Sequence, residues 1–186
     1  MISDDYLISV LQLAKDGGVI GNTDLGEEVA RARVFSRVLR TLGEAQHLLD
    51  IGSGGGLPGL VLAHDFPEMS VTLIDRREKR TDLLQRQARK LRQSVPGSEI
   101  EVICADVNSL HGTARFDVIT ARSFGSPDVV LETALPLLTT EGYLLVSEPP
   151  NADGGRWSRD TLRRLNASIT LHTESTTSLA VIQLQR

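Results

Sequence analysis

The sequence predicts an α/β fold in which a mostly parallel sheet is covered by helices on both faces. From residue 46 onward, short and almost continuously apolar segments alternate with longer segments of helical periodicity, a pattern typical of parallel sheets with both faces buried. One apolar segment, ending at Asp50, runs directly into a glycine-rich loop that opens a helix, and α/β sheets bind nucleotides at such turns. The length of 186 residues and the hydrophobic fraction of 40% fit one globular domain.

Two helices are expected ahead of the sheet. Apolar residues recur at helical spacing over 3–15, with Ser3 as the N-cap, and a pair of glycines ends that helix. A second helix is expected over 25–42, because its apolar residues fall on one side. We expect residues 1–45 to form a helical extension of a single domain and residues 46–186 to form its α/β core.

The elements expected in the core follow the same alternation. Strands are expected up to Asp50, up to Asp75, and over 99–104, 116–121 and 142–147. Helices are expected from Pro58, over 76–92 and over 127–138. A loop rich in Pro, Gly and Asn then precedes a short helix near 157–165 and two strands over 168–172 and 179–184. Since a polar turn joins these two strands, the chain is predicted to end in an antiparallel hairpin.

The loop after the first strand is the part of the sequence most indicative of function. It contains Gly52, Gly54 and Gly56, and glycines let a ligand approach the backbone closely and permit positive φ. The next apolar strand ends in Asp75, about 20 residues after the loop, where a βαβ unit places a carboxylate beside the two hydroxyls of a ribose. The combination predicts a nucleotide site and disfavours a glycine turn that binds nothing.

Residues 54–59 also match the GxGxxG pattern of dinucleotide sites, so two cofactors compete. In a dinucleotide site the diphosphate lies at the N-terminus of the helix, but here the strand closes with an acid, Asp50. A carboxylate there repels a diphosphate and attracts the ammonium and sulfonium of S-adenosylmethionine, which carries no phosphate. We therefore favour S-adenosylmethionine over a nicotinamide dinucleotide.

Several segments together match one known family. They are the glycine-loop sequence over 49–59, the Phe-Pro-Glu turn at 66–68, the strand over 71–75 with the Lys-Arg pair at 79–80, and 116–122, which ends in Thr-Ala-Arg. Over about 47–146 the chain resembles the RsmG (GidB) family of bacterial 16S ribosomal RNA guanine-N7 methyltransferases. The resemblance implies a class I, Rossmann-like fold, S-adenosylmethionine as cofactor and a role in rRNA processing.

The resemblance also assigns roles to residues that follow the strands. Gly52 and Leu57 line the cofactor loop, and Asp75 holds the ribose hydroxyls. The turn at 106–108 contacts the adenine through backbone amides and a neighbouring side chain, although by itself this segment also fits an ordinary Asp/Asn turn. With the residues of the loop argument added, the predicted cofactor-binding set is Asp50, Gly52, Gly54, Gly56, Leu57, Asp75, Asp106, Val107, Asn108 and Arg122.

Arg122 closes the fourth expected strand, at the carboxyl edge where open α/β sheets bind ligands. It matches the family's arginine there, and we assign it the catalytic role, through cofactor contact or electrostatic positioning of the substrate. A buried structural arginine is the alternative. Because N7 of guanine has a free lone pair, attack on the sulfonium methyl depends on alignment of the reactants and needs no general base.

Two other nucleic-acid methylations are disfavoured. Amino methyltransferases place Asn/Asp-Pro-Pro-aromatic after the fourth strand, where this chain has Arg122, Ser123 and Phe124. C5 methylation needs a nucleophilic cysteine, whereas Cys104, the one cysteine, is expected to be buried in a strand.

The chain also departs from the family pattern. Members of the family usually carry Asn-Leu-Thr and His-x-x-x-Ser elements ahead of the glycine loop, and this chain lacks both. Residues 147–150 stand where the family has a Lys-Gly pair. A small-molecule or different RNA substrate, or a cofactor-binding module without turnover, are therefore kept as alternatives.

Basic residues gather in one segment although the net charge is −4. Residues 76–92 hold eight basic and two acidic side chains, and local charge decides where a polyanion docks. Since one side of this expected helix is apolar, the other presents its charges either to RNA phosphates or only to solvent. The predicted partner is 16S rRNA or the small ribosomal subunit, contacted by Arg76, Arg77, Lys79, Arg80 and Arg86. Trp157, between two arginines, either stacks on a base or anchors a helix in the core.

The remaining features argue against several classes of protein. The start lacks a basic segment before an apolar run, and no stretch approaches the roughly 20 apolar residues of a membrane span, so a cytoplasmic protein is expected. A single cysteine forms no internal disulfide, and the four histidines lack ligand spacing, so no metal is expected.

Overall fold

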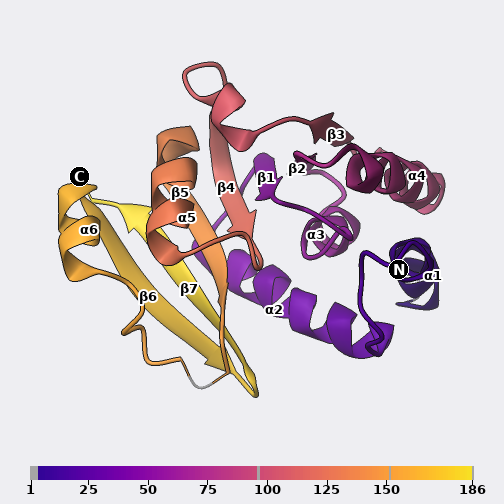
Figure 1. The fold of residues 1–186 in the computed structure, drawn as a ribbon, viewed down its shortest axis with the longest axis horizontal. Coiled ribbons are helices and arrows are strands. Elements are labelled where there is room, and N and C mark those ends of the chain that lie inside the picture. Colours follow the sequence, from indigo (N-terminus) through magenta and orange to yellow (C-terminus); the bar gives the residue numbers. More distant parts are fainter. Residues whose placement is uncertain (1–3, 96, 151, 186) are drawn as a thin grey trace.

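A single seven-stranded sheet, in the order β3-β2-β1-β4-β5-β7-β6, forms the centre of the molecule (Figure 1). The structure is a computed structural model that describes residues 4–95, 97–150 and 152–185. The five strands from β3 to β5 are parallel, whereas β7 runs antiparallel to β5 and β6 antiparallel to β7. The predicted mostly parallel sheet with a C-terminal antiparallel hairpin is therefore confirmed.

The elements follow the chain in the expected alternation. The strands are β1 (His47–Ile51), β2 (Ser70–Asp75), β3 (Ile100–Cys104), β4 (Phe116–Ala121), β5 (Leu138–Glu148), β6 (Ala167–Glu174) and β7 (Thr177–Leu184). The α-helices are α1 (Asp4–Asp16), α2 (Leu25–Leu42), α3 (Gly59–Asp65), α4 (Glu78–Ser94), α5 (Pro127–Ala134) and α6 (Arg159–Arg164). Two short 3₁₀ helices, η1 (Val107–Leu110) and η2 (Leu135–Leu137), complete the set. The expected N-cap Ser3 lies outside the described residues.

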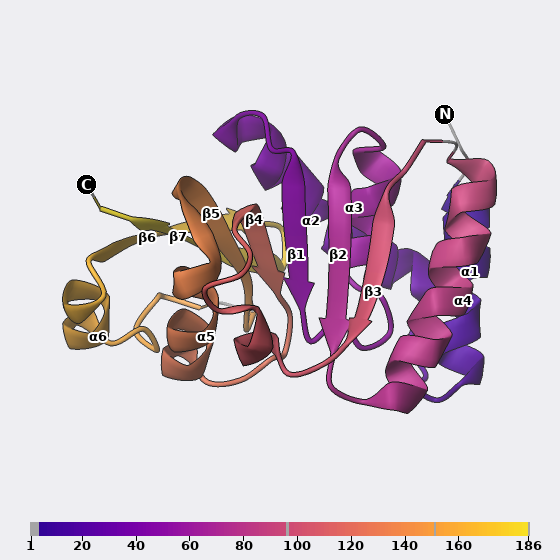
Figure 2. The ribbon, with the colours of Figure 1, turned by 90° about the horizontal axis from the view of Figure 1, so that it is seen from above.

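Helices cover both faces of the sheet (Figure 2). Alternate strand residues enter two hydrophobic clusters, so that Leu48 packs with α1 to α4 whereas Leu49 packs with α5, α6 and the 3₁₀ helices. Residues of α1 such as Leu7 and Leu11 are fully buried in the first cluster. This shared core supports the proposal that the N-terminal helices and the sheet form a single domain.

Two local expectations were wrong for identifiable reasons. The helix expected over 127–138 ends at Ala134, because Pro136 cannot donate a backbone hydrogen bond within a helix, and β5 begins earlier than expected, at Leu138. Cys104 is exposed rather than buried, because β3 pairs only with β2 and forms an edge of the sheet. Over the ranges that the structure describes, none of the helices is long and apolar enough to cross a membrane.

Candidate active site

The carboxyl ends of β1, β2 and β4 surround two adjoining cavities of about 320 and 400 Å³. Both are lined by Gly52, Arg80 and Ser123. The first cavity adds residues from the glycine loop, the α1–α2 connection and α2, and the second adds the ends of β2 and β3. Cavities of this size at the carboxyl edge are the usual ligand sites of open α/β sheets.

The glycine loop passes between the two cavities and is held by the end of β2. Gly52 has a φ of 66°, and a side chain there would place its Cβ 2.7 Å from Cδ2 of Phe124, so only glycine fits. The backbone amide of Gly54 donates to Oδ2 of Asp75 over 3.2 Å. The amide of Ser53 donates to the carbonyl of Ile74 over 3.1 Å. These bonds fix the loop that the sequence predicts as a cofactor cradle.

Asp75 is buried at the rim of the second cavity, with 5% of its surface exposed. Besides Gly54, its carboxylate accepts a hydrogen bond from the amide of Arg77 over 2.9 Å at Oδ1. Nη1 of Arg80 lies 3.4 Å from Oδ2. The carboxylate is therefore fixed in direction, and Asp75 lines a cavity large enough for a nucleoside.

The turn after β3 lines the same cavity through Asp106, Val107 and Asn108. Oδ1 of Asp106 accepts from the backbone amide of Asn108 over 2.9 Å and thereby caps η1. The ordinary Asx turn is thus present, and it lines the same cavity as Phe124, while the predicted adenine contact stays a prediction.

Two predicted cofactor residues, Asp50 and Gly56, lie beneath the loop and line neither cavity. Asp50 is only 1% exposed, and Oγ1 of Thr120 donates to its Oδ1 over 2.7 Å. Burial raises the pKa of the Asp50 carboxyl to about 6. A Cβ at Gly56 would lie 2.3 Å from Cδ1 of Leu60, in the interior. Both residues support the loop from below, because the chain turns over them into α3, and their contact with the cofactor stays a prediction.

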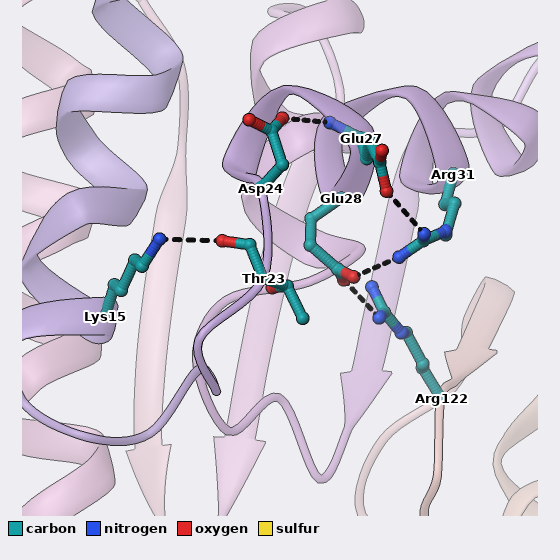
Figure 3. Close-up of polar contacts among 7 residues, drawn as sticks. All are labelled: Lys15, Thr23, Asp24, Glu27, Glu28, Arg31 and Arg122. Carbon is teal, nitrogen blue, oxygen red and sulfur yellow. Dashed lines mark hydrogen bonds and ion pairs between the residues drawn. The ribbon is translucent and has the colours of Figure 1, made fainter.

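Arg122 reaches from the end of β4 into the first cavity, where it meets a carboxylate from the N-terminal extension (Figure 3). Its Nη2 pairs with Oε2 of Glu28, and Oε1 of Glu28 pairs with Arg31. Glu28 is 4% exposed, and the Arg122 side chain is 28% exposed. Nη1 of Arg122 is buried and has no hydrogen-bond partner among the described residues. Nη2 of the guanidinium is therefore paired with Glu28, whereas Nη1 is a buried donor without an acceptor in the part of the chain that the structure describes.

The connection between α1 and α2 forms the outer wall of the first cavity (Figure 3). Nζ of Lys15 donates to the carbonyl of Thr23 over 2.7 Å, and Asp24 caps α2 by accepting from the amide of Glu27 over 2.9 Å. Ile20 packs against Gly55, where an added Cβ would lie 2.6 Å from its Cγ1. The N-terminal extension thus forms part of the wall of the first cavity.

The sequence analysis missed Glu28, although the sequence carries a sign of it. Glu28 lies on the apolar stripe of α2, one turn before Ala32 and two turns before Phe35, all of them buried. An acid on a buried stripe needs a partner, and here the partner is Arg122.

Comparison with known proteins places the chain in a family. The model of the GidB family, described as rRNA small subunit methyltransferase G, matches residues 4–185. The chain belongs to the GidB family. Ribosomal RNA small subunit methyltransferase G of Nocardioides sp. is 34% identical over 142 residues, which are 72% of this chain and 55% of that protein. The enzyme of the same name from Thermotoga sp. is 38% identical over 104 residues, 56% of this chain and 45% of that protein. The chain spans about half the length of these curated relatives.

Solved structures show the same fold at low sequence identity. Cofactor-bound Rv0187 from MTB superposes with a TM-score of 0.69 at 15% identity, covering 98% of this chain and 90% of that one. Ribosomal protein L11 methylase from Lactobacillus delbrueckii subsp. bulgaricus gives a TM-score of 0.65 at 15% identity, over 90% and 81%. The GidB chain therefore has the predicted class I, Rossmann-like methyltransferase fold.

The basic helix of the GidB chain divides its cations between internal contacts and an exposed face. Arg80 turns toward Asp75, Lys90 donates to the carbonyl of Ser9 over 2.9 Å, and Arg92 donates to the carbonyl of Ile100 over 3.3 Å. The cations that are exposed and have no such contact are Arg76, Arg77, Lys79, Arg86 and Arg89. Arg80, predicted as an RNA contact, also lines the two cavities, and its contact with RNA stays a prediction.

Gln87, on the buried side of the same helix, joins three elements. Its Nε2 donates to the carbonyl of Gly55 over 3.1 Å and to that of Val10 over 3.3 Å. The glycine loop, α1 and α4 therefore meet at one side chain.

Trp157 is buried, with 3% of its surface exposed, and packs in the cluster beneath α5 and α6. Its Nε1 donates to Oε1 of Glu148 over 3.1 Å. Of the two interpretations of Trp157, the core anchor is confirmed, and stacking on a base is wrong because the ring is covered.

Proposed function

We propose that the chain is an S-adenosylmethionine-dependent methyltransferase that methylates N7 of a guanine in 16S rRNA. The observation that carries this proposal is the meeting of Asp75, the glycine loop and the Glu28–Arg122 pair around adjoining cavities at the carboxyl edge. Membership of the GidB family supports the same reaction. A 16S rRNA substrate also agrees with the cytoplasmic location that the sequence predicts.

The residues around the two cavities fit the three parts of S-adenosylmethionine. Asp75 accepts hydrogen bonds from ribose hydroxyls, and the 106–108 turn and Phe124 hold the adenine in the second cavity. Gly52, Gly54 and Leu57 allow the cofactor to approach the loop in the first cavity.

The amino acid end of the cofactor is a zwitterion, and the first cavity offers a matching pair of charges. The unfilled Nη1 donor of Arg122 binds the carboxylate, and Glu28 accepts from the ammonium. Because Glu28 holds the other side of the guanidinium, Arg122 is oriented before the cofactor arrives.

When bound, the cofactor supplies a methyl group on a sulfonium. The acceptor N7 carries a lone pair and no proton, so the protein has to align the reactants and need not remove a proton. The guanidinium of Arg122 is a positive charge that orients its partners. Its catalytic role is therefore positional and electrostatic.

The exposed face of α4 is the proposed contact with RNA phosphates. Lys79 and Arg86 lie on it, and Arg76 and Arg77 precede the helix in the turn that lines the second cavity. Positive side chains on one helix face bind the backbone of a polyanion without reading its sequence. The substrate assigned to this face is 16S rRNA, free or in the small subunit.

The test combines cofactor binding with methyl transfer. We expect calorimetry to show binding of S-adenosylmethionine and not of NAD, and tritiated methyl to be transferred to 30S subunits or 16S RNA that lack this modification. Digestion of the product should yield 7-methylguanosine. Binding of NAD alone would overturn the cofactor assignment, and cofactor binding without transfer to either RNA substrate would overturn the substrate assignment.

A further inference from the structure

A third cavity, of about 360 Å³, lies beside the proposed cofactor site at the ends of β4 and β5. It shares Ser123 and Phe124 with the second cofactor cavity. The rest of its lining comes from α5, the end of β5 and the segment before α6: Gly125, Val130, Val146, Ser147, Glu148, Pro149 and Arg156. A molecule in this cavity therefore lies next to the proposed cofactor without occupying the cofactor site.

Glu148, the last residue of β5, lines this cavity and carries an unfilled acceptor below the cavity surface. Its side chain is fully buried, and Oε1 accepts the hydrogen bond of Trp157. Oε2 is buried as well and has no hydrogen-bond partner among the described residues. Burial raises the pKa of the Glu148 carboxyl, whereas the charge of Arg156 opposes this. A buried acceptor without a partner is costly, and a ligand donor that fills it recovers that cost.

Arg156 sets a hydrogen-bond donor beside this acceptor. Its Nη1 lies 3.7 Å from Oε1 of Glu148, and its guanidinium carbon lies 5.6 Å from the centre of the Trp157 ring. The side chain is 32% exposed, and the described residues give the guanidinium no closer polar contact. A shift of this exposed side chain would uncover the Glu148 carboxylate and let the guanidinium donate to a ligand in the cavity.

Guanine is the nucleobase that can bind this acceptor and this donor with one edge. The Watson–Crick edge of guanine has two adjacent donors, N1–H and N2–H, next to an acceptor, O6. A carboxylate can accept from both donors, and a guanidinium can donate to O6. Adenine, cytosine and uracil each lack the pair of adjacent donors.

We propose that this third cavity holds the target guanine by its Watson–Crick edge, with Glu148 accepting from N1–H and N2–H and Arg156 donating to O6. The inference rests on the proposed methyl transfer to guanine. N7 lies next to O6 on the adjoining Hoogsteen edge, so this grip leaves N7 without a contact to Glu148 and able to face Ser123, Phe124 and the cofactor cavities. Glu148 selects and positions the base and takes no part in proton transfer.

The first test is Glu148→Gln, which keeps an acceptor for Trp157 and replaces the free acceptor by a donor. We expect kcat/KM on unmethylated 30S subunits to fall about 10- to 100-fold, mainly through KM, as for the loss of a hydrogen bond to a charged group. The affinity for S-adenosylmethionine should stay within about twofold. Glu132→Gln is the matched control, because Glu132 is an exposed acid on α5 that pairs with Arg164. Equal kcat/KM for the two variants would overturn the proposal.

The second test needs no methyl transfer, because Trp157 is the only tryptophan and is hydrogen-bonded to Glu148. We expect its fluorescence to respond to GMP with at least tenfold higher affinity than to IMP, which lacks the N2 amino group, or to AMP. Equal responses to all three nucleotides, or no response to GMP, would overturn the guanine site, including the case in which Glu148→Gln fails to fold. A response to GMP in a protein that methylates no RNA would keep the guanine site and remove the proposed function.

Discussion

The carboxyl edge of the sheet has two halves that treat their charged groups differently. At the ends of β1 and β2, the carboxylate of Asp75 accepts hydrogen bonds from the amides of Gly54 and Arg77. Oδ2 of Asp50 in this half has no hydrogen-bond partner among the described residues, but Asp50 does not line the cavities. At the ends of β4 and β5, Nη1 of Arg122 and Oε2 of Glu148 are buried without a hydrogen-bond partner within the described chain. A carboxylate with its donors in place fixes a loop, whereas an unfilled donor or acceptor gains most from a ligand. The first half is thus preorganised, and the second half is completed by what binds there.

The largest effect is expected from Asp75→Ala, which removes the hydrogen-bonded carboxylate at the end of β2. The S-adenosylmethionine Kd should rise about 100-fold, because the ribose loses hydrogen bonds to a charged group. Unfolding free energy should fall by about 1–3 kcal/mol, because the amides of Gly54 and Arg77 lose their acceptor. Calorimetry and denaturant unfolding measure the two effects. Asp82→Ala, at an exposed acid of α4, is the control, and equal behaviour of the two variants would contradict this role of Asp75.

Asp50, in β1, tests the same half of the edge through the pH dependence of folding stability. Its folded pKa of about 6 lies above the ordinary value of 3.8, so the folded state holds the proton more tightly and Asp50 favours folding most below pH 4. Relative to Asp50→Asn, the stability of the wild-type protein should fall by about 2 kcal/mol as pH rises from 4 to 6, and level off above about pH 7. Urea unfolding of both proteins across this range measures the difference. A difference that does not change with pH would show that Asp50 titrates normally.

A double-mutant cycle at the Glu28–Arg122 pair tests the other half of the carboxyl edge, at the ends of β4 and β5. Arg122→Ala should raise the S-adenosylmethionine Kd about 30-fold and Glu28→Gln about tenfold, since each removes a hydrogen bond to one charge of the zwitterion. The double variant should lose less than the product, because the two side chains are in contact. Arg31→Ala, which removes the other arginine of Glu28, should change Kd less than threefold. Strict additivity in calorimetry would argue against a joint site.

The smallest effect is expected outside both halves, on the exposed face of α4. Arg86→Ala should weaken RNA binding about threefold and lower the slope of log K against log salt by about 1, because one phosphate contact is lost. The exposed Arg163 of α6 offers the control Arg163→Ala, for which we expect an unchanged slope. Filter binding to 16S RNA at several salt concentrations measures both, and equal slopes would remove α4 from the interface.

Local patterns predicted the parts of the fold that depend on neighbours in sequence. The helix expected over 25–42 and the strand expected over 116–121 have those bounds in the structure, and the glycine loop leads to Asp75 as expected. These segments have strong periodicity and clear ends, which local sequence determines.

What the sequence did not predict depends on contacts between distant segments. Glu28 becomes a site residue only because Arg122, 94 positions later, lies opposite it. Asp50 and Gly56 lie under the loop because α3 folds over them, and no spacing rule distinguishes above from below. Glu148 carries no local sign of a cavity, since β5, α5 and the segment before α6 come together only in the tertiary fold.

The hydrogen bonds of Gln87 have a consequence for the order of events on this protein. Its amide holds the carbonyl of Gly55 from a helix whose opposite face carries the exposed arginines. A polyanion that shifts or stiffens α4 changes the freedom of the glycine loop, and a ligand on the loop changes the freedom of α4. By thermodynamic reciprocity the two affinities are then linked by one coupling factor, so that whichever molecule arrives first alters the binding of the second by the same ratio.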